Sequence, residues 1–190
     1  LDYFDLGGGF GIAYDAQAPA PEPIEDFAQA LIPLLQETRL KIIMEPGRFI
    51  AGNSGIFITK TLYLKDNGIK KFIIVDAGMN DLPRPFLYDA YHEIVPVEER
   101  HRDEDTFDVV GPICESGDFF AKERRMPVVK QGELLAIKSA GAYCYAMASN
   151  YNVRGRAPEV MVKGEEYAVI KTRETVRDLM RGESIPKFLQ

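Results

Sequence analysis

The stretch GIFITKTLYL, residues 55–64, divides the chain into two parts with different patterns. Its β-branched and aromatic residues are typical of a β-strand. Before it, the spacing of apolar residues predicts a strand, a helix and a second strand over residues 1–6, 22–37 and 40–44. Strand, helix and strand in this order form an α/β pattern. We therefore expect residues 1–53 to be the end of an α/β domain and residues 54–190 to be a β-rich domain.

After this stretch, short β-branched runs predict strands over residues 71–75, 106–113, 133–139, 159–162 and 166–172. Turn signals separate several of them, at residues 66–68, 131–132 and 163–164. Many short strands joined by tight turns are typical of a β-sandwich or a β-barrel. Two details concern helices. Pro33 should kink or end the first helix, and Thr172 is a candidate cap for a short helix over residues 173–180.

The composition limits the class of protein. Among the 190 residues 46% are hydrophobic and 27% are charged, so a packed core can form and disorder is excluded as the main state. The net charge of −6 argues against a nucleic-acid partner. No apolar run approaches the ~18–20 residues that cross a bilayer, so we expect no membrane partner. Two cysteines and two histidines form neither a disulfide scaffold nor a metal-binding pattern, and a reducing, cytoplasmic compartment is expected.

Two short motifs follow the predicted strands of the α/β part. Gly7, Gly8 and Gly9 could bring backbone amides close to a phosphate, or could form only a tight turn. Glu45 and Arg48, in the sequence EPGR, would lie at a strand end, where catalytic groups collect in α/β folds. The carboxylate could hold a protonated heterocyclic nitrogen, and the arginine could pair with a carboxylate or phosphate. The alternative is a turn with an exposed ion pair.

Three further candidates lie in the β-rich part. Arg84 stands between two prolines that stiffen the backbone, and it suits recognition of a planar carboxylate or is a solvent-exposed loop arginine. Cys114, among carboxylates and turn residues, could transfer a proton or could be a buried small hydrophobe. Tyr143 could reach a phosphate or could pack in the core. We expect Cys144 and His92 to be structural, and the absence of a Gly-x-Ser-x-Gly motif excludes an α/β-hydrolase.

In chain order, five motifs resemble those of bacterial diaminopimelate decarboxylases, which are fold-type III enzymes that use pyridoxal 5′-phosphate. The motifs are LGGGFG (6–11), EPGR (45–48), DAGMNDLPRPFLYDAYH (76–92), VGPICESGD (110–118) and AGAYCYAMASNYN (140–152). The resemblance covers nearly the whole chain and concerns the C-terminal half of the family. CESGD, followed by GAY and SNYN, also separates the chain from ornithine and arginine decarboxylases, whose cysteine motif differs.

The resemblance implies the end of a pyridoxal-phosphate-binding (β/α)8 barrel, followed by a β-sandwich or barrel-like domain. It implies decarboxylation of meso-2,6-diaminopimelate to L-lysine and carbon dioxide, the last step of lysine biosynthesis, by a homodimer whose active sites are shared across the interface. The residues implied to hold the cofactor are Gly9, Glu45, Pro46, Gly47, Arg48 and Tyr143. Those implied to bind the substrate are Arg48, Arg84 and Tyr88 at the distal carboxylate, Glu115 at the distal ammonium group, and Tyr143. Cys114 would be the catalytic proton donor, delivered with Glu115 from the partner subunit.

The chain departs from the family at the cofactor lysine. In the family this lysine lies upstream, in a motif like Tyr-x-x-Lys-Ala-Asn, as does the histidine that stacks on the cofactor, and no lysine here has that context. Pro83 replaces a residue that is usually aliphatic. We therefore expect part of a longer enzyme that is inactive in isolation. Two alternatives stay open: a decarboxylase of another diamino acid, such as lysine or ornithine, and a non-catalytic regulator. The absent lysine favours the regulator, whereas CESGD and EPGR disfavour it.

Overall fold

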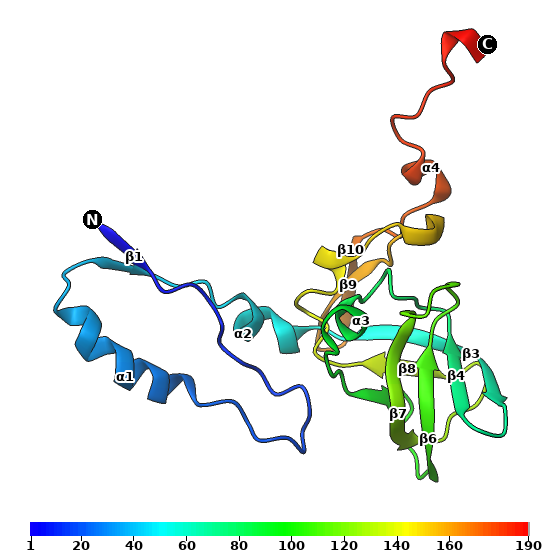
Figure 1. Ribbon diagram of the computed structural model, residues 1–190, viewed down its shortest axis with the longest axis horizontal. Coiled ribbons are helices and arrows are strands. Elements are labelled where there is room, and N and C mark those ends of the chain that lie inside the picture. Colours follow the sequence, from blue (N-terminus) through cyan, green and yellow to red (C-terminus); the bar gives the residue numbers. More distant parts are fainter. Residues whose placement is uncertain (190) are drawn as a thin grey trace.

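The computed structural model describes residues 1–189, which form four α-helices, four short 3-10 turns and ten β-strands (Figure 1). The helices are α1 (Ile24–Gln36), α2 (Gly47–Ala51), α3 (Arg84–Tyr88) and α4 (Val176–Leu179). The strands are β1 (Tyr3–Asp5), β2 (Lys41–Ile43), β3 (Phe57–Asp66), β4 (Lys71–Val75), β5 (Ile94–Pro96), β6 (Glu104–Val110), β7 (Phe119–Pro127), β8 (Leu134–Ile137), β9 (Glu159–Lys163) and β10 (Glu166–Lys171). None of the helices within residues 1–189 is long and apolar enough to span a bilayer.

The first part of the chain forms the predicted strand–helix–strand unit. β1 and β2 pair in parallel, with Phe4 opposite Ile42, and α1 connects them. Helix α1 begins after Pro23 and continues past Pro33 to its end. The prediction that Pro33 could end this helix is therefore wrong. No residue between 1 and 51 is buried, so this unit has no core of its own.

Six strands form one mixed sheet in the order β5-β8-β3-β4-β6-β7. Neighbouring strands are antiparallel except for β4 and β6, which pair in parallel. The sheet curls until its two edge strands, β5 and β7, contact each other. These edge strands are also the two that the sequence pattern does not predict. The nearly closed sheet is barrel-like, and the sandwich alternative, which needs two sheets packed face to face, does not hold.

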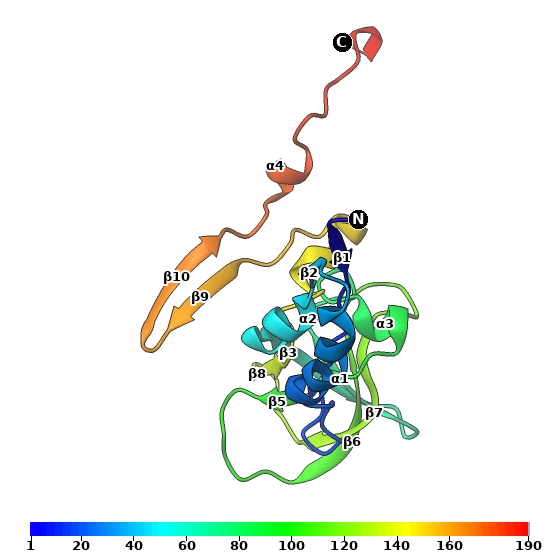
Figure 2. The ribbon, with the colours of Figure 1, turned by 90° about the vertical axis from the view of Figure 1, so that its left-hand side faces the viewer.

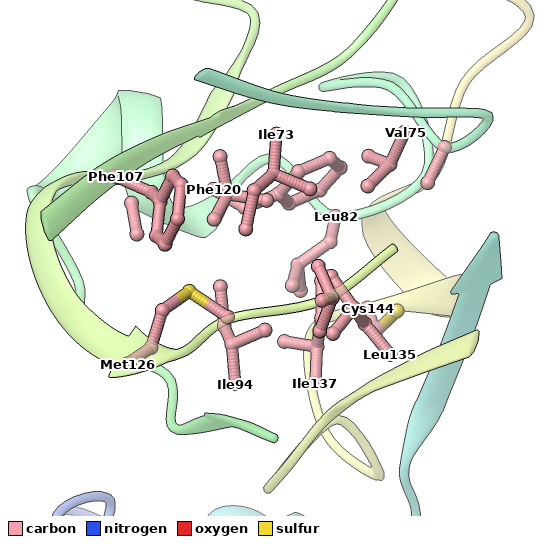
Figure 3. Packing of buried hydrophobic residues seen from close by; sticks show 14 residues of the cluster. Ile73, Val75, Leu82, Ile94, Phe107, Phe120, Met126, Leu135, Ile137 and Cys144 are labelled. Atoms are coloured by element: carbon pink, nitrogen blue, oxygen red, sulfur yellow. The ribbon is translucent and has the colours of Figure 1, made fainter. Parts of the chain in front are cut away.

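The inside of the curled sheet is the hydrophobic core (Figure 3). β4 shows how the sequence builds it: successive side chains point to opposite faces of a strand, and both Ile73 and Val75 are fully buried. Other strands and two loops supply further core side chains, which include Leu82, Phe107, Val109, Phe120, Met126, Leu135, Ile137 and Cys144. Cys144 is therefore structural, as predicted, and burial raises the pKa of its thiol to about 12.

The last part of the chain leaves the sheet as a separate hairpin of β9 and β10, followed by α4 (Figure 2). The N-cap of α4 is Thr175, whose hydroxyl accepts a hydrogen bond from the backbone N–H of Asp178, while the Asp178 carboxylate accepts one from the backbone N–H of Thr175. Such a capping box needs an acidic or amide side chain three residues after the cap. Thr172 has no such residue at that position, so the prediction of Thr172 as the cap is wrong.

Candidate active site

The glycine run and the EPGR motif meet where β1 and β2 end. Because these strands are parallel, their carboxyl ends lie at one edge, and the backbone N–H of Glu45 donates to the carbonyl of Gly7 at 2.8 Å. A Cβ on Gly8 would lie 2.6 Å from the Glu45 carbonyl oxygen, and Gly7 and Gly9 have φ values of +67° and +94°. Both features require glycine, so the run forms a tight turn against the start of EPGR.

This glycine turn leaves backbone donors free. Within residues 1–189 the amides of Gly8 and Gly9 have no hydrogen-bond partner, and a Cβ built on Gly9 or Gly47 would meet no atom within 4 Å. Backbone N–H groups in such an open place suit a phosphate oxygen. In the same part of the chain no ion pair joins Glu45 to Arg48. The alternative of an exposed ion pair in this turn is therefore wrong, and both side chains can act on a ligand.

Arg48, on α2, faces Tyr143 in the turn after β8. The guanidinium carbon of Arg48 lies 5.7 Å from the centre of the Tyr143 ring, a cation–π distance. Tyr143 is 42% exposed and has a φ of +60°, a strained backbone conformation for a tyrosine. Its turn packs closely on α2, since a Cβ on Gly141 would lie 1.9 Å from the carbonyl oxygen of Ala51. The core-packing alternative for Tyr143 is therefore wrong, and this contact joins the α/β part to the β-rich part.

The segment that leads from β4 to Arg84 is buried from residue 77 to residue 85. Asp81 shows how it is fixed: its carboxylate accepts a hydrogen bond from the backbone N–H of Gly78 at 2.9 Å, and its carbonyl accepts one from the Cys144 thiol at 3.4 Å. Burial raises the pKa of the Asp81 carboxyl, and the bond from Gly78 partly opposes this rise. The alternative of a solvent-exposed loop arginine is therefore wrong, because Arg84 belongs to a buried, hydrogen-bonded segment.

Arg84 begins α3 and is 7% exposed. Its Nη1 lies 2.9 Å from Nε2 of His92, and its guanidinium carbon lies 4.7 Å from the centre of the Tyr14 ring. The guanidinium makes no other hydrogen bond within residues 1–189, so donors remain for a carboxylate. His92 is fully buried, in agreement with its predicted structural role. Tyr88, at the other end of α3, is 65% exposed.

Cys114 lies in the turn between β6 and β7, and its side chain is exposed, so the alternative of a buried hydrophobe is wrong. The turn is fixed by Asp118, which is 5% exposed and whose carboxylate accepts hydrogen bonds from the backbone N–H groups of Ile113 and Met79. Burial raises the pKa of this carboxyl, and the two hydrogen bonds oppose the rise. Met79 belongs to the buried segment before Arg84. A single carboxylate therefore connects the cysteine turn to the arginine segment.

The predicted site residues fall into three groups in the structure. The groups are the glycine turn with Glu45, Pro46 and Gly47; Arg48 with Tyr143; and α3, with Arg84 and Tyr88, beside the turn of Cys114 and Glu115. The cysteine turn lies next to α3, since a Cβ on Gly117 would be in ordinary van der Waals contact with Phe86 of α3, at 3.5 Å. Within residues 1–189 no hydrogen bond, ion pair or ring contact joins Cys114 to Arg48 or Tyr143. In the same range no group of three or more potential metal ligands is found.

Three residues that hold this site were not predicted to belong to it. Tyr14 and His92 contact Arg84, and Asp118 fixes the cysteine turn. For two of them the sequence offered a clue, because His92 and Asp118 are the last residues of the motifs over residues 76–92 and 110–118. For Tyr14 it offered none, because its ring meets Arg84 only through the tertiary fold, and Tyr14 lies outside the motif that contains Arg84.

Comparisons with known proteins agree on one family. Residues 12–141 match the family model described as pyridoxal-dependent decarboxylase, C-terminal sheet domain. The chain is 53% identical over 174 residues to the diaminopimelate decarboxylase of Aquifex aeolicus, which covers 92% of this chain and 41% of that relative. It resembles the crystal structure of diaminopimelate decarboxylase from Helicobacter pylori complexed with L-lysine, with a TM-score of 0.86, 43% identity, and coverage of 94% of this chain and 44% of that one. The chain thus spans less than half the length of these relatives.

A more distant structure is the lysine/ornithine decarboxylase from Vibrio vulnificus complexed with cadaverine. Its TM-score is 0.72 and its identity 24%, with coverage of 83% of this chain and 43% of that one. At this identity the likeness shows a shared fold and does not bear on the substrate.

Proposed function

Because this chain belongs to the pyridoxal-dependent decarboxylases, we propose that it is the C-terminal part of an enzyme that converts meso-2,6-diaminopimelate to L-lysine and carbon dioxide. Curated relatives with 43–53% identity carry the name of that activity. One solved relative is complexed with L-lysine, the product of this reaction. The structural observation that carries the proposal is the contact between Arg48 and Tyr143, because it brings residues of both parts of the chain to one place.

We propose that the cofactor is held by both parts. Glu45, at the end of β2, would hold a proton on the pyridine nitrogen, because a carboxylate stabilises a positive charge close to it. The open, side-chain-free places at Gly9 and Gly47 fit a phosphate, and Tyr143 would contact the same phosphate. When bound, pyridoxal phosphate would take up the electrons that remain at the α-carbon after carbon dioxide leaves.

The distal end of the substrate carries one carboxylate and one ammonium group. Arg48, Arg84 and Tyr88 would bind the carboxylate, and Glu115 would bind the ammonium group. The unused donors of Arg84 and the exposed side chains of Tyr88 and Glu115 support these roles. A substrate without the distal carboxylate would leave Arg84 unpaired, and an unpaired buried charge weakens binding.

Cys114 would donate a proton to the α-carbon after carbon dioxide has left. Its exposed side chain supports this role. We place Cys114 and Glu115 in the site of a second copy, in a homodimer; the lack of a hydrogen bond, ion pair or ring contact from Cys114 to Arg48 or Tyr143 within residues 1–189 is consistent with this placement. Residues 1–53 would then be the end of a (β/α)8 barrel that carries the cofactor, and residues 54–190 the C-terminal domain.

The experiment is an assay of the full-length protein, with pyridoxal phosphate, on meso-diaminopimelate, L-lysine and L-ornithine as substrates. Carbon dioxide release and product formation are measured. We expect kcat/KM for meso-diaminopimelate to exceed the other two values by about 10⁴-fold, since only this substrate pairs with Arg84. Comparable values for L-lysine or L-ornithine would instead support a decarboxylase of those amino acids. No turnover of any substrate would support a non-catalytic regulator.

A further inference from the structure

His92 lies between the side chain of Arg84 and a backbone carbonyl group. Its Nε2 is 2.9 Å from Nη1 of Arg84, and its Nδ1 is 2.8 Å from the carbonyl oxygen of Lys138, just after β8. The imidazole is fully buried. The ring of Tyr14 packs edge to face against it, with 5.2 Å between ring centres, and also lies against the Arg84 guanidinium. The guanidinium is therefore fixed from two sides.

The two partners decide which nitrogen of His92 carries the proton. A guanidinium has only donors, and a carbonyl oxygen only accepts. Nε2 must therefore accept from Arg84, and the Nδ1–H group must donate to Lys138. In this arrangement the imidazole is neutral. A second proton, on Nε2, would place two donors against each other and break the hydrogen bond to Arg84.

We propose that His92 is a positioning residue that aims Arg84 at the distal carboxylate of the substrate, and that protonation of His92 releases Arg84 from this orientation. The proposal rests on the proposed function, in which Arg84 binds that carboxylate. His92 acts only through Arg84, because its own ring is fully buried and both of its nitrogens are in hydrogen bonds.

The surroundings of His92 favour its neutral form. The groups that face it from the neighbouring elements are Arg84 on α3, Arg124 on β7, Tyr14 in the loop after β1, and the ion pair of Lys138 with Glu93 beside β8 and β5. Burial lowers the pKa of His92 from its ordinary value of 6.5, and the charges of Arg84 and Arg124 add to this effect, while the hydrogen bond to Lys138 opposes it. Arg84 is therefore held at neutral pH, and its release is expected only as the pH falls below 6.5.

Two substitutions separate the two hydrogen bonds of His92. In His92→Gln the side-chain amide oxygen can take the position of Nε2 and accept from Arg84. In His92→Asn the shorter side chain places its amide near Nδ1, where it can donate to Lys138 but cannot reach Arg84. The full-length protein with bound cofactor is titrated with L-lysine, which retains the distal carboxylate. Cadaverine, which has no carboxylate, is the control ligand.

We expect His92→Asn to weaken L-lysine binding by about ten- to a hundredfold, as for loss of a hydrogen bond to a charged group, and His92→Gln by less than about threefold. Cadaverine binding should not change in either variant. In the wild-type protein the Kd of L-lysine should rise as the pH falls below 6.5, and in His92→Gln this rise should be absent. His101→Gln is the matched control, because His101 is the other histidine of the chain and is exposed.

Equal effects of the two substitutions at His92, or a rise at acid pH that persists in His92→Gln, would overturn the proposal. If His92→Asn does not fold, the pH comparison between the wild-type protein and His92→Gln decides alone. Turnover of meso-diaminopimelate by the wild-type protein tests the proposed function separately. Full turnover together with L-lysine binding that is independent of His92 would overturn only the role of His92.

Discussion

Residues 1–51 and the six-stranded sheet differ in how they bury their apolar side chains. Between residues 1 and 51 no side chain is buried, and the apolar face of α1 lines an open groove of about 490 Å³ together with Leu6, after β1, and residues in and around β2. The sheet encloses its own core, in which Phe120 is 2% exposed and Leu135 is inaccessible. An amphipathic element needs a second layer to cover its apolar face. The sheet provides this layer by curling, and the α/β unit has none within residues 1–189.

The same difference extends to the candidate site. Glu45 and the glycine turn are held by strand pairing and backbone contacts. Arg84 and the turn of Cys114 are held by buried side chains, among them His92 and Asp118. We therefore expect changes in the first region to alter cofactor binding, and changes in the second to alter substrate binding and proton transfer.

Replacement of Cys114 should produce the largest change in the second region. A positioned proton donor typically contributes about 10²–10⁴-fold to the rate. We expect kcat for meso-diaminopimelate to fall by this factor in Cys114→Ala of the full-length protein, while cofactor binding, followed by absorbance, is unchanged. Cys144→Ala is the matched control, because its thiol lies in the core and should affect thermal stability, with a loss of kcat far smaller than that of Cys114→Ala. An unchanged kcat in Cys114→Ala would show that Cys114 is not the proton donor.

Two identical substitutions compare the cores of the two regions. Phe120 is 2% exposed, and Phe120→Ala should lower the free energy of unfolding by about 3–5 kcal/mol. Phe27, on α1, is 37% exposed, and Phe27→Ala should cost about 1 kcal/mol or less in the 190-residue chain. Urea unfolding measures both losses. Equal losses of unfolding free energy from the two substitutions would contradict the difference in burial between the two regions. If Phe27→Ala costs more in the full-length protein than in the 190-residue chain, a further layer of the full-length protein covers α1.

Arg84→Ala and Glu45→Ala should affect different ligands. Loss of Arg84 should weaken L-lysine binding at saturating cofactor by about ten- to a hundredfold, because its partner carboxylate loses a charged hydrogen-bond donor. Loss of Glu45 should weaken cofactor binding and leave L-lysine binding within about threefold of wild type. Both are measured by titration of the full-length protein. If both variants weakened the same ligand, the division of roles between the two regions would fail.

Strands with a clean apolar pattern could be predicted from the sequence, and the edge strand β7 could not. β4 reads KFIIV and was predicted with its observed bounds. β7 contains four successive charged residues over 122–125, and Glu123 has a φ of +48°, which interrupts the strand alternation. These charges find partners that are distant in the sequence: Arg125 pairs with Glu104 of β6 at 2.8 Å, and Arg124 donates to the carbonyl of His92. The sequence pattern does not show partners that come from elsewhere in the chain, so a charged edge strand such as β7 is predicted to be a loop.

The motifs indicate which side chains are chemically suited to a site, but not what holds them. The prolines around Arg84 suggest a loop, although Pro85 lies in the first turn of α3, where a missing N–H costs little. A charged residue is rarely buried without a partner, and the partners of Arg84 are Tyr14 and His92, which arrive from other elements. These contacts depend on the tertiary fold, so sequence patterns could not provide them.

The most direct measurement is a crystal structure of the full-length protein with pyridoxal phosphate and L-lysine. We expect the guanidinium groups of Arg48 and Arg84 within about 3 Å of the L-lysine carboxylate. The thiol of Cys114 from a second copy should lie beside the ε-carbon of L-lysine, which is the carbon that loses the carboxylate in the proposed reaction. An L-lysine carboxylate bound away from Arg84, or a Cys114 thiol remote from L-lysine in both copies, would contradict the proposed site.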